Sequence, residues 1–192
     1  MRSWRAWLVV GGLTVMLALA QYGVGLRRLA YDRTAIAAGQ WWRCYTGSWV
    51  HYSFSHLAMN VVALALIAGV LLADLPWRLW LLLLALLPWA VSLGLWYGQP
   101  QCQIYAGFSG VIEGLLFFAL WRAWRRDPWL YGLALVFFGA RLVYEHTPWY
   151  DPNYLQAWIG VAVAPSAHLA GALSGSLLAL IGVGRDKLVE IR

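Results

Sequence analysis

A short stretch in the middle of the chain carries residues that could do chemistry. It reads YAGFSGVIEG over residues 105–114, so Ser109 stands between two glycines and Glu113 follows one helical turn later. A serine hydroxyl is unreactive by itself and becomes a nucleophile only beside a general base. Ser109 is therefore either a nucleophile whose base lies elsewhere in the chain or a small residue where two helices touch.

Ionisable residues are rare in the apolar segments of this sequence, and a charge at the middle of a membrane costs on the order of 3 kcal/mol on insertion scales. Three of the apolar segments are expected to begin on the same side of the membrane. Their first two turns contain His56, Asn60, Ser109 and His168. Four hydrogen-bonding groups from three helices at one depth predict a polar pocket below the surface.

Two pairs of glycines indicate which helices approach closely enough to form that pocket. Their G-x-x-x-G spacing allows backbones to pack closely in lipid. The pairs are Gly110 with Gly114 and Gly171 with Gly175. Close approach would bring the His168 imidazole to the Ser109 hydroxyl, whereas ordinary helix packing is the simpler explanation of the glycines alone.

The elements that must position these residues follow from composition. Of the 192 residues, 62% are hydrophobic and only 11% are charged, and a helix needs roughly 20 apolar residues to cross a bilayer. The sequence therefore predicts an all-α polytopic membrane protein without a soluble domain. The expected helices are 7–26, 54–73, 77–97, 107–124, 129–145 and 164–183.

The first of these segments imitates a secretory signal, with MRSWR, an apolar stretch and ALA at residues 18–20. We expect a retained helix, because the apolar run continues to Leu26.

Basic residues act as orientation signals. The net charge of +6 could suggest nucleic acid, but the residues form no patch. Nine are expected on the inner side, against four outside: Arg2, Arg5, Arg78, Arg122, Arg125, Arg126, Arg185, Lys187 and Arg192, against Arg27, Arg28, Arg33 and Arg43. Both termini are therefore expected in the cytoplasm, with no nucleic-acid partner.

Aromatic residues and cysteines fit the same topology. Tryptophans near the helix ends predict an interfacial belt, and neither a metal nor a cofactor is needed to explain them. They are Trp4, Trp7, Trp41, Trp42, Trp77, Trp80, Trp121, Trp124 and Trp129. Cys44 and Cys102 fall in outer connections, where an oxidising periplasm could join them in a disulfide. Two unpaired thiols are the alternative.

Four motifs in order resemble those of the rhomboid family of intramembrane serine proteases. They are WWR at 41–43, HYSFSHLAMN at 51–60, GFSG at 107–110 and AHLAGALSG at 167–175. The family patterns that they resemble are, in that order, W-R of the first outer loop, H-x-x-x-x-H-x-x-x-N, G-x-S-G and A-H-x-x-G-x-x-x-G of the last helix. The resemblance implies a six-transmembrane-helix rhomboid bundle, with the whole chain, 1–192, as a single membrane domain.

The resemblance also implies roles for individual residues. Ser109 would be the nucleophile and His168 the general base of a catalytic dyad. His56, Asn60 and the backbone N–H of Ser109 would form the oxyanion hole, since a helix start directs free N–H groups to that place. His51 would hold water or position a loop, or be an interfacial histidine without a role. The supporting residues are Gly107, Gly110, Glu113, Gly171, Gly175 and His51.

Within the family, the compact format and the YAGFSG context look like the rhombosortase branch. That resemblance implies substrates among exported, membrane-anchored proteins with a C-terminal glycine-glycine motif, an apolar helix and a basic tail (GlyGly-CTERM). It implies a bacterial inner membrane with the active site toward the periplasm, and hydrolysis of the peptide bond or transfer to an amine. The fifth helix would be the lateral gate.

Three acidic and basic residues depart from the family pattern or lie outside it. Glu113 stands where many rhomboids carry a tyrosine; it could orient His168 as a third catalytic member, or be protonated or ion-paired for structural reasons. Arg141 and Glu145, one turn apart, are expected to form a local ion pair, with substrate recognition as the alternative.

Two other functions compete with proteolysis. A transporter also uses intramembrane His, Glu and Arg, but the two halves of the chain show no convincing repeat. A non-catalytic rhomboid-like binding protein would keep the fold and lose the dyad, whereas Ser109 and His168 are both present.

Overall fold

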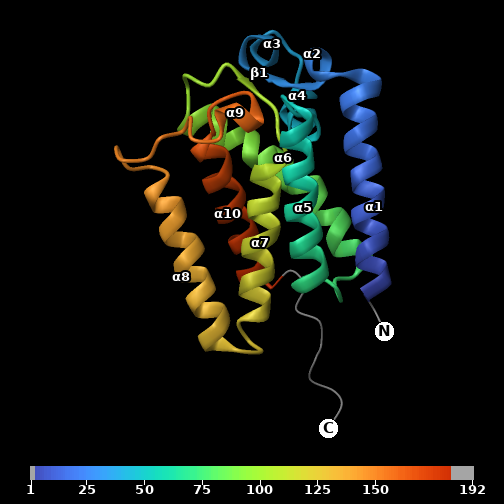
Figure 1. The fold of residues 1–192 in the computed structure, drawn as a ribbon, viewed down its shortest axis with the longest axis vertical. Coiled ribbons are helices and arrows are strands. Elements are labelled where there is room, and N and C mark those ends of the chain that lie inside the picture. The colour runs from blue at the N-terminus through green and yellow to red at the C-terminus, as the bar shows by residue number, and fades with distance from the viewer. Residues whose placement is uncertain (1–2, 183–192) are drawn as a thin grey trace.

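Long helices standing side by side make up most of the chain (Figure 1). The computed structural model describes residues 3–182. The long helices are α1 (Ser3–Leu19), α5 (Phe54–Val70), α6 (Trp77–Gly98), α7 (Ser109–Ala123), α8 (Pro128–Tyr144) and α10 (Pro165–Leu180). Their ends lie within a few residues of those expected, except that α1 begins at Ser3 and its last turn, Ala20–Val24, is π-helical (η1). Residue 183 and the basic residues Arg2, Arg185, Lys187 and Arg192 lie outside the described part.

Among the described residues, two helices are long and apolar enough to cross a membrane, Trp4–Val24 and Trp77–Gly98. A third span results if Arg43–Trp49 and Phe54–Val70, which meet at a bend of 87°, count as one, and Pro128–Tyr144 is a shorter apolar helix. The expected count of six spans is therefore not reached by length and composition alone.

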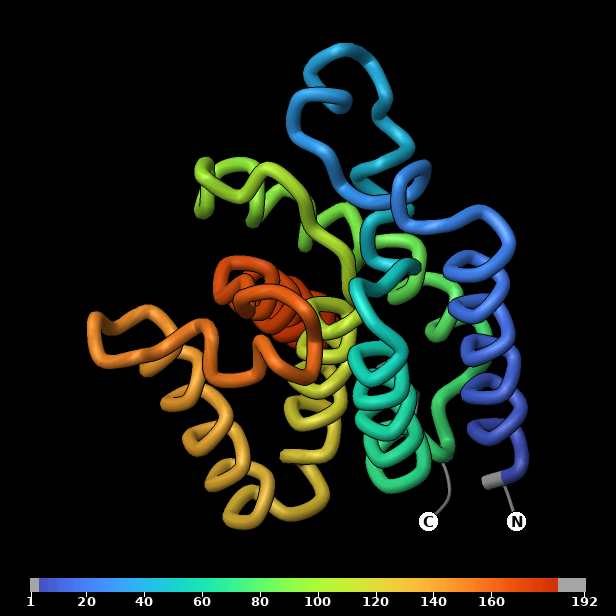
Figure 2. The backbone as a smooth tube through the Cα atoms, turned by 45° about the horizontal axis from the view of Figure 1, so that its top comes forward, coloured from blue at the N-terminus to red at the C-terminus, as the bar shows by residue number. Residues whose placement is uncertain are grey.

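Short elements gather at one end of the bundle, where Figure 2 shows residues 26–50 projecting beyond α1 and α5. They are α2 (Leu26–Leu29), β1 (Tyr31–Asp32), α3 (Arg33–Ala37), α4 (Arg43–Thr46), the 3-10 turn η2 (Gly47–Trp49), β2 (Ile104–Tyr105) and α9 (Gln156–Ile159). β1 pairs antiparallel with β2, with Tyr31 opposite Tyr105. This pairing ties the loop before α5 to the loop before α7.

Two arginines hold this end together through backbone carbonyls. Arg33 donates from its guanidinium to the carbonyl oxygens of Leu95 and Trp96 at 2.8 and 3.0 Å, near the end of α6. Arg43, the arginine of the WWR motif, donates to the carbonyl of Ala30 at 2.9 Å. Arg33 and Arg43, interpreted from the sequence as orientation signals, therefore also hold the segment between α1 and α5 in place.

Local sequence explains where the site helices begin. The Ser53 hydroxyl accepts a hydrogen bond from the His56 N–H and caps α5. The Asp127 carboxylate caps α8, and Pro128 follows at its first position. Pro165 likewise stands at the start of α10. These starts fix the depth at which the polar residues of the first turns lie.

Helix α7 is the centre of the bundle. Eleven of its fifteen residues are buried, and α10 packs along it, as the central position of both in Figure 1 shows. By contrast, only Leu142 of α8 is buried, and α8 stands at the edge of the bundle.

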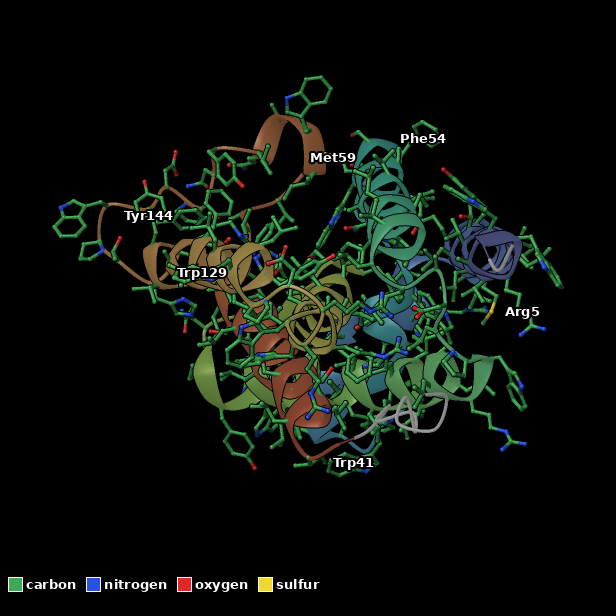
Figure 3. All side chains as sticks on the ribbon, turned by 90° about the horizontal axis from the view of Figure 1, so that it is seen from below. Arg5, Trp41, Phe54, Met59, Trp129 and Tyr144 are labelled. Carbon is green, nitrogen blue, oxygen red and sulfur yellow. The ribbon has the colours of Figure 1, made fainter. Side chains whose placement is uncertain are left out.

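Figure 3 shows the labelled side chains of Arg5, Trp41 and Phe54 pointing away from the bundle. Trp80, expected in the interfacial belt, is instead a core residue with 3% of its surface exposed.

The two glycine pairs meet at the contact between α7 and α10. A Cβ atom at position 171 would overlap the carbonyl oxygen of Gly110, and one at 175 would overlap that of Gly114. Backbone therefore lies directly on backbone, as the G-x-x-x-G spacing predicts.

We expect Gly171→Ala to lower the free energy of unfolding by about 1–3 kcal/mol, because a carbonyl oxygen cannot move aside as a flexible side chain can. Gly11→Ala on α1 is the matched control, since nothing lies within 4 Å of a Cβ there. Unfolding of the purified proteins by dodecyl sulfate in mixed micelles measures both. Equal stability of the two variants would contradict the tight contact.

Candidate active site

The hydroxyl of Ser109 and the imidazole of His168 are joined across the contact between α7 and α10. Ser109 Oγ lies 3.1 Å from His168 Nε2. Ser109 is the first residue of α7, and His168 is in the first turn of α10. The close glycine contact thus sets a serine beside a base, the arrangement that activates a serine hydroxyl.

His168 makes a second contact that the sequence did not predict. Its Nδ1 atom lies 2.9 Å from Oε2 of Glu145, the C-terminal cap of α8. The other carboxylate oxygen of Glu145 pairs with the Arg141 guanidinium. The expected Arg141–Glu145 ion pair is therefore present, but Glu145 also connects α8 to α10.

Glu113 belongs to the same charged cluster without contacting the imidazole. Its Oε1 atom lies 2.6 Å from a guanidinium nitrogen of Arg141. The carboxylate that contacts His168 belongs to Glu145 and not to Glu113. The structure favours the ion-pair alternative for Glu113.

A cavity of about 260 Å³ opens beside the serine and the histidine. His56, Asn60, Ser109 and His168, the four residues predicted to share one depth, all line it. Met59, labelled in Figure 3, lines it from α5, and Ile159 does so from α9. The cavity thus lies between α5, the loop before α7, α9 and α10.

Hydrogen-bond donors are available at the cavity wall. Within residues 3–182, the side-chain nitrogen Nδ2 of Asn60 is buried and has no hydrogen-bond partner. The His56 ring is stacked on Tyr52, with the ring planes 4° apart. Ser109 begins α7 with no side-chain cap, and the first N–H groups of a helix have no partner within the helix. These groups can stabilise a negative charge that develops on an oxygen beside Ser109 Oγ.

The turn before Ser109 needs glycine at position 107. Gly107 has a φ angle of +148°, which other residues rarely adopt, and a Cβ there would lie 2.7 Å from Cε1 of His56. The Tyr105 hydroxyl donates to the Gly107 carbonyl at 2.8 Å. Gly107 therefore allows His56 to lie directly against the turn that presents the serine.

His51 holds the same turn from the other side. Its Nε2 atom accepts from the N–H of Phe108 at 3.4 Å, and its ring meets the His56 ring edge-on at 5.0 Å. Burial, together with the neighbouring His56, lowers the pKa of His51 to about 3. The ring is therefore neutral near pH 7 and can accept a hydrogen bond, which supports the loop-positioning alternative for this residue.

Neither a disulfide nor a metal site is present among the described residues, although Cys102 lines the cavity. Cys44 and Cys102 are free cysteines, so the structure does not contain the disulfide that was considered. In the part of the chain that the structure describes, no group of three or more His, Cys, Asp or Glu side chains is arranged to hold a metal ion.

The sequence matches a known family over most of its length. Residues 38–185 match the family model of the rhomboid domain, and the chain belongs to the rhomboid family. Its members are generally intramembrane serine proteases that act on membrane-protein substrates within the bilayer. The family and the apolar helices together make this chain a membrane-embedded protein. No curated protein matches its sequence.

Proposed function

We propose that the chain is an active intramembrane serine endopeptidase, with Ser109 as the nucleophile and His168 as the general base. The observation that carries this proposal is the 3.1 Å contact between Ser109 Oγ and His168 Nε2 at the wall of a cavity. The non-catalytic binding protein considered from the sequence has no need for this contact.

The chemistry follows from the positions of the groups. Ser109 Oγ attacks the substrate carbonyl carbon while its proton passes to His168 Nε2. The peptide C–N bond then breaks, and the imidazolium gives the proton to the departing amine, which leaves an ester on Ser109. Water attacks that ester, His168 takes a proton from the water and returns it to Ser109 Oγ, and the acid product leaves.

The oxyanion of both tetrahedral intermediates is assigned to the side chains of Asn60 and His56 and to the N–H of Ser109. The unpartnered Asn60 amide supports this assignment, because a buried donor without a partner is costly unless a ligand uses it. Removing one such donor typically lowers turnover about 100-fold or more.

The proposed substrate is the membrane anchor of an exported protein, of the glycine-glycine, apolar-helix and basic-tail type, as the resemblance to rhombosortases implies. We place the chain in a bacterial inner membrane, with six helices spanning it, both termini in the cytoplasm and the cavity toward the periplasm. The start of α1 and the end of α10 lie at the end of the bundle opposite α9 (Figure 1), and α9 contributes Ile159 to the cavity, which supports this orientation. The peripheral α8 is the proposed gate.

A fluorophosphonate probe tests the function directly. We expect it to label the purified wild-type protein in detergent and to leave Ser109→Ala and His168→Ala unlabelled, because only a serine beside a base reacts. Ser92→Ala is the matched control and should label normally, since Ser92 is a buried serine on α6 that donates to the Cys44 carbonyl, away from His168.

The substrate assignment is tested by cleavage of a reporter protein that carries the proposed anchor, with its glycine pair, apolar helix and basic tail. Loss of cleavage when the glycine pair is replaced would support it. An unlabelled wild-type protein, beside a soluble serine protease that labels in the same detergent, would leave a binding protein or a transporter as the better reading.

A further inference from the structure

We propose that Glu145 is a positioning residue for His168, so that the site works as a serine–histidine–glutamate triad in which the acid comes from α8. This inference rests on the proposed function, and it adds a residue that the dyad of the resemblance does not include.

The two contacts of the imidazole determine where its proton lies. A carboxylate can only accept hydrogen bonds, so the 2.9 Å contact with Glu145 requires a hydrogen on His168 Nδ1. In the neutral ring, Nε2 then carries none. Nε2 is the atom 3.1 Å from Ser109 Oγ, so the ring presents a free lone pair to the hydroxyl that it must deprotonate.

Burial strengthens the interaction between the Glu145 carboxylate and the His168 imidazole. The Glu145 side chain is only 3% exposed and that of His168 13%. A charge interaction is stronger where water is excluded. When the imidazole takes the serine proton, the adjacent carboxylate stabilises the positive charge that forms.

Arg141 offsets the energetic cost of burying the Glu145 carboxylate. A buried carboxylate needs a partner of opposite charge, and Arg141 pairs with Glu145 one turn away on the same helix. The guanidinium also contacts Glu113 on α7. Arg141 therefore fixes the end of α8 against α7, and Glu145 fixes it against α10.

The placement of the acid on α8 has a mechanical consequence. The serine and the histidine lie on α7 and α10, which are packed backbone to backbone, whereas α8 and its C-cap contribute only Leu142 and Glu145 to the buried residues. Movement of α8 away from α10 would withdraw Glu145 from His168 and leave the contact between Ser109 and His168 in place.

The variant Glu145→Gln tests the role, with Glu113→Gln as its matched control. Both changes replace a carboxylate that pairs with Arg141 by an amide of the same shape, but only one of them alters the contact with His168. Replacing the acid of a triad lowers kcat by about 10⁴-fold in serine proteases of other folds. For Glu145→Gln we expect kcat on the anchor reporter to fall at least about 100-fold with KM within about threefold, and a fall below about tenfold for Glu113→Gln.

A nitrogen-15 spectrum of the imidazole gives a readout that a purely structural role would not change. The chain has four histidines, so His168 can be assigned by comparison with His168→Ala. In the wild-type protein we expect the hydrogen on Nδ1, and in Glu145→Gln a shift of the population toward hydrogen on Nε2.

The outcomes separate the two proposals. A wild-type protein that neither labels nor cleaves would overturn the proposed function. A cleaving wild-type protein whose His168 carries its hydrogen on Nε2, or a Glu145→Gln variant with the wild-type kcat, would overturn the role of Glu145 alone. The wild-type nitrogen-15 spectrum tests the role of Glu145 even if the Glu145→Gln variant does not fold.

Discussion

Ser109→Ala is expected to lower kcat for cleavage of the anchor reporter by about 10⁶-fold, and His168→Ala by a similar factor. The two groups act in one step, since the serine reacts only as the imidazole takes its proton across the 3.1 Å contact. The double variant should therefore be no slower than either single variant, because each single change already abolishes the step in which Ser109 and His168 act together. Single-turnover cleavage with excess protein measures all three.

Binding of the reporter is the control, because the groups that line the cavity remain in these variants. The cavity, the Asn60 amide and the helix start are unaffected by Ser109→Ala, so reporter binding should stay within about threefold of the wild type. Additive losses in the double variant would contradict a shared step. They would indicate that Ser109 and His168 contribute to separate parts of the reaction.

The positions of the helices and of the serine and histidine could be predicted because the signals for them are local. Apolar runs determine the long helices. The caps Ser53 and Asp127, and Pro165 at the first position of α10, determine where three of them begin. The glycine spacing of α7 and α10 indicated their contact, and the first-turn positions of Ser109 and His168 indicated a common depth. Each signal spans only a few residues of sequence.

The role of Glu145 was missed for a physical reason. Arg141 and Glu145 are four residues apart, so the pair looks complete within α8. Which neighbour the carboxylate faces depends on the rotation of α8 about its axis. Most residues of α8 are apolar whether they are buried or exposed, so their pattern does not fix that rotation. One signal was present: the C-terminal end of the fifth helix lies at the same level as the starts of α7 and α10.

The short elements at the cavity end of the bundle could likewise not be predicted from local sequence patterns. β1 and β2 have two residues each, and their pairing joins Tyr31 to Tyr105 across 74 positions of sequence. Arg33 and Arg43 read as charges on one side of a membrane, whereas their guanidinium groups bind carbonyls of distant segments. Trp80 is three residues into α6 and still belongs to the core, because α6 is covered there by other helices.

Arg141→Met is expected to lower the free energy of unfolding by about 3–5 kcal/mol, because it leaves the buried Glu145 carboxylate and the partly buried Glu113 carboxylate without the cation that both of them contact. The side chains of Glu113 and Glu145 are only 14% and 3% exposed, so water cannot replace the guanidinium. Unfolding by dodecyl sulfate in mixed micelles, followed by circular dichroism, measures the difference.

Arg126→Met is the matched control for the loss of an arginine ion pair. Arg126 lies 2.7 Å from Asp74, but its side chain is 55% exposed, and such pairs contribute about 0–1 kcal/mol. Adding Glu113→Gln to Arg141→Met should recover part of the loss, since it removes one of the two uncompensated charges. If Arg141→Met costs no more than Arg126→Met, the cluster does not need its central cation, and the buried Glu145 must be held by His168 alone.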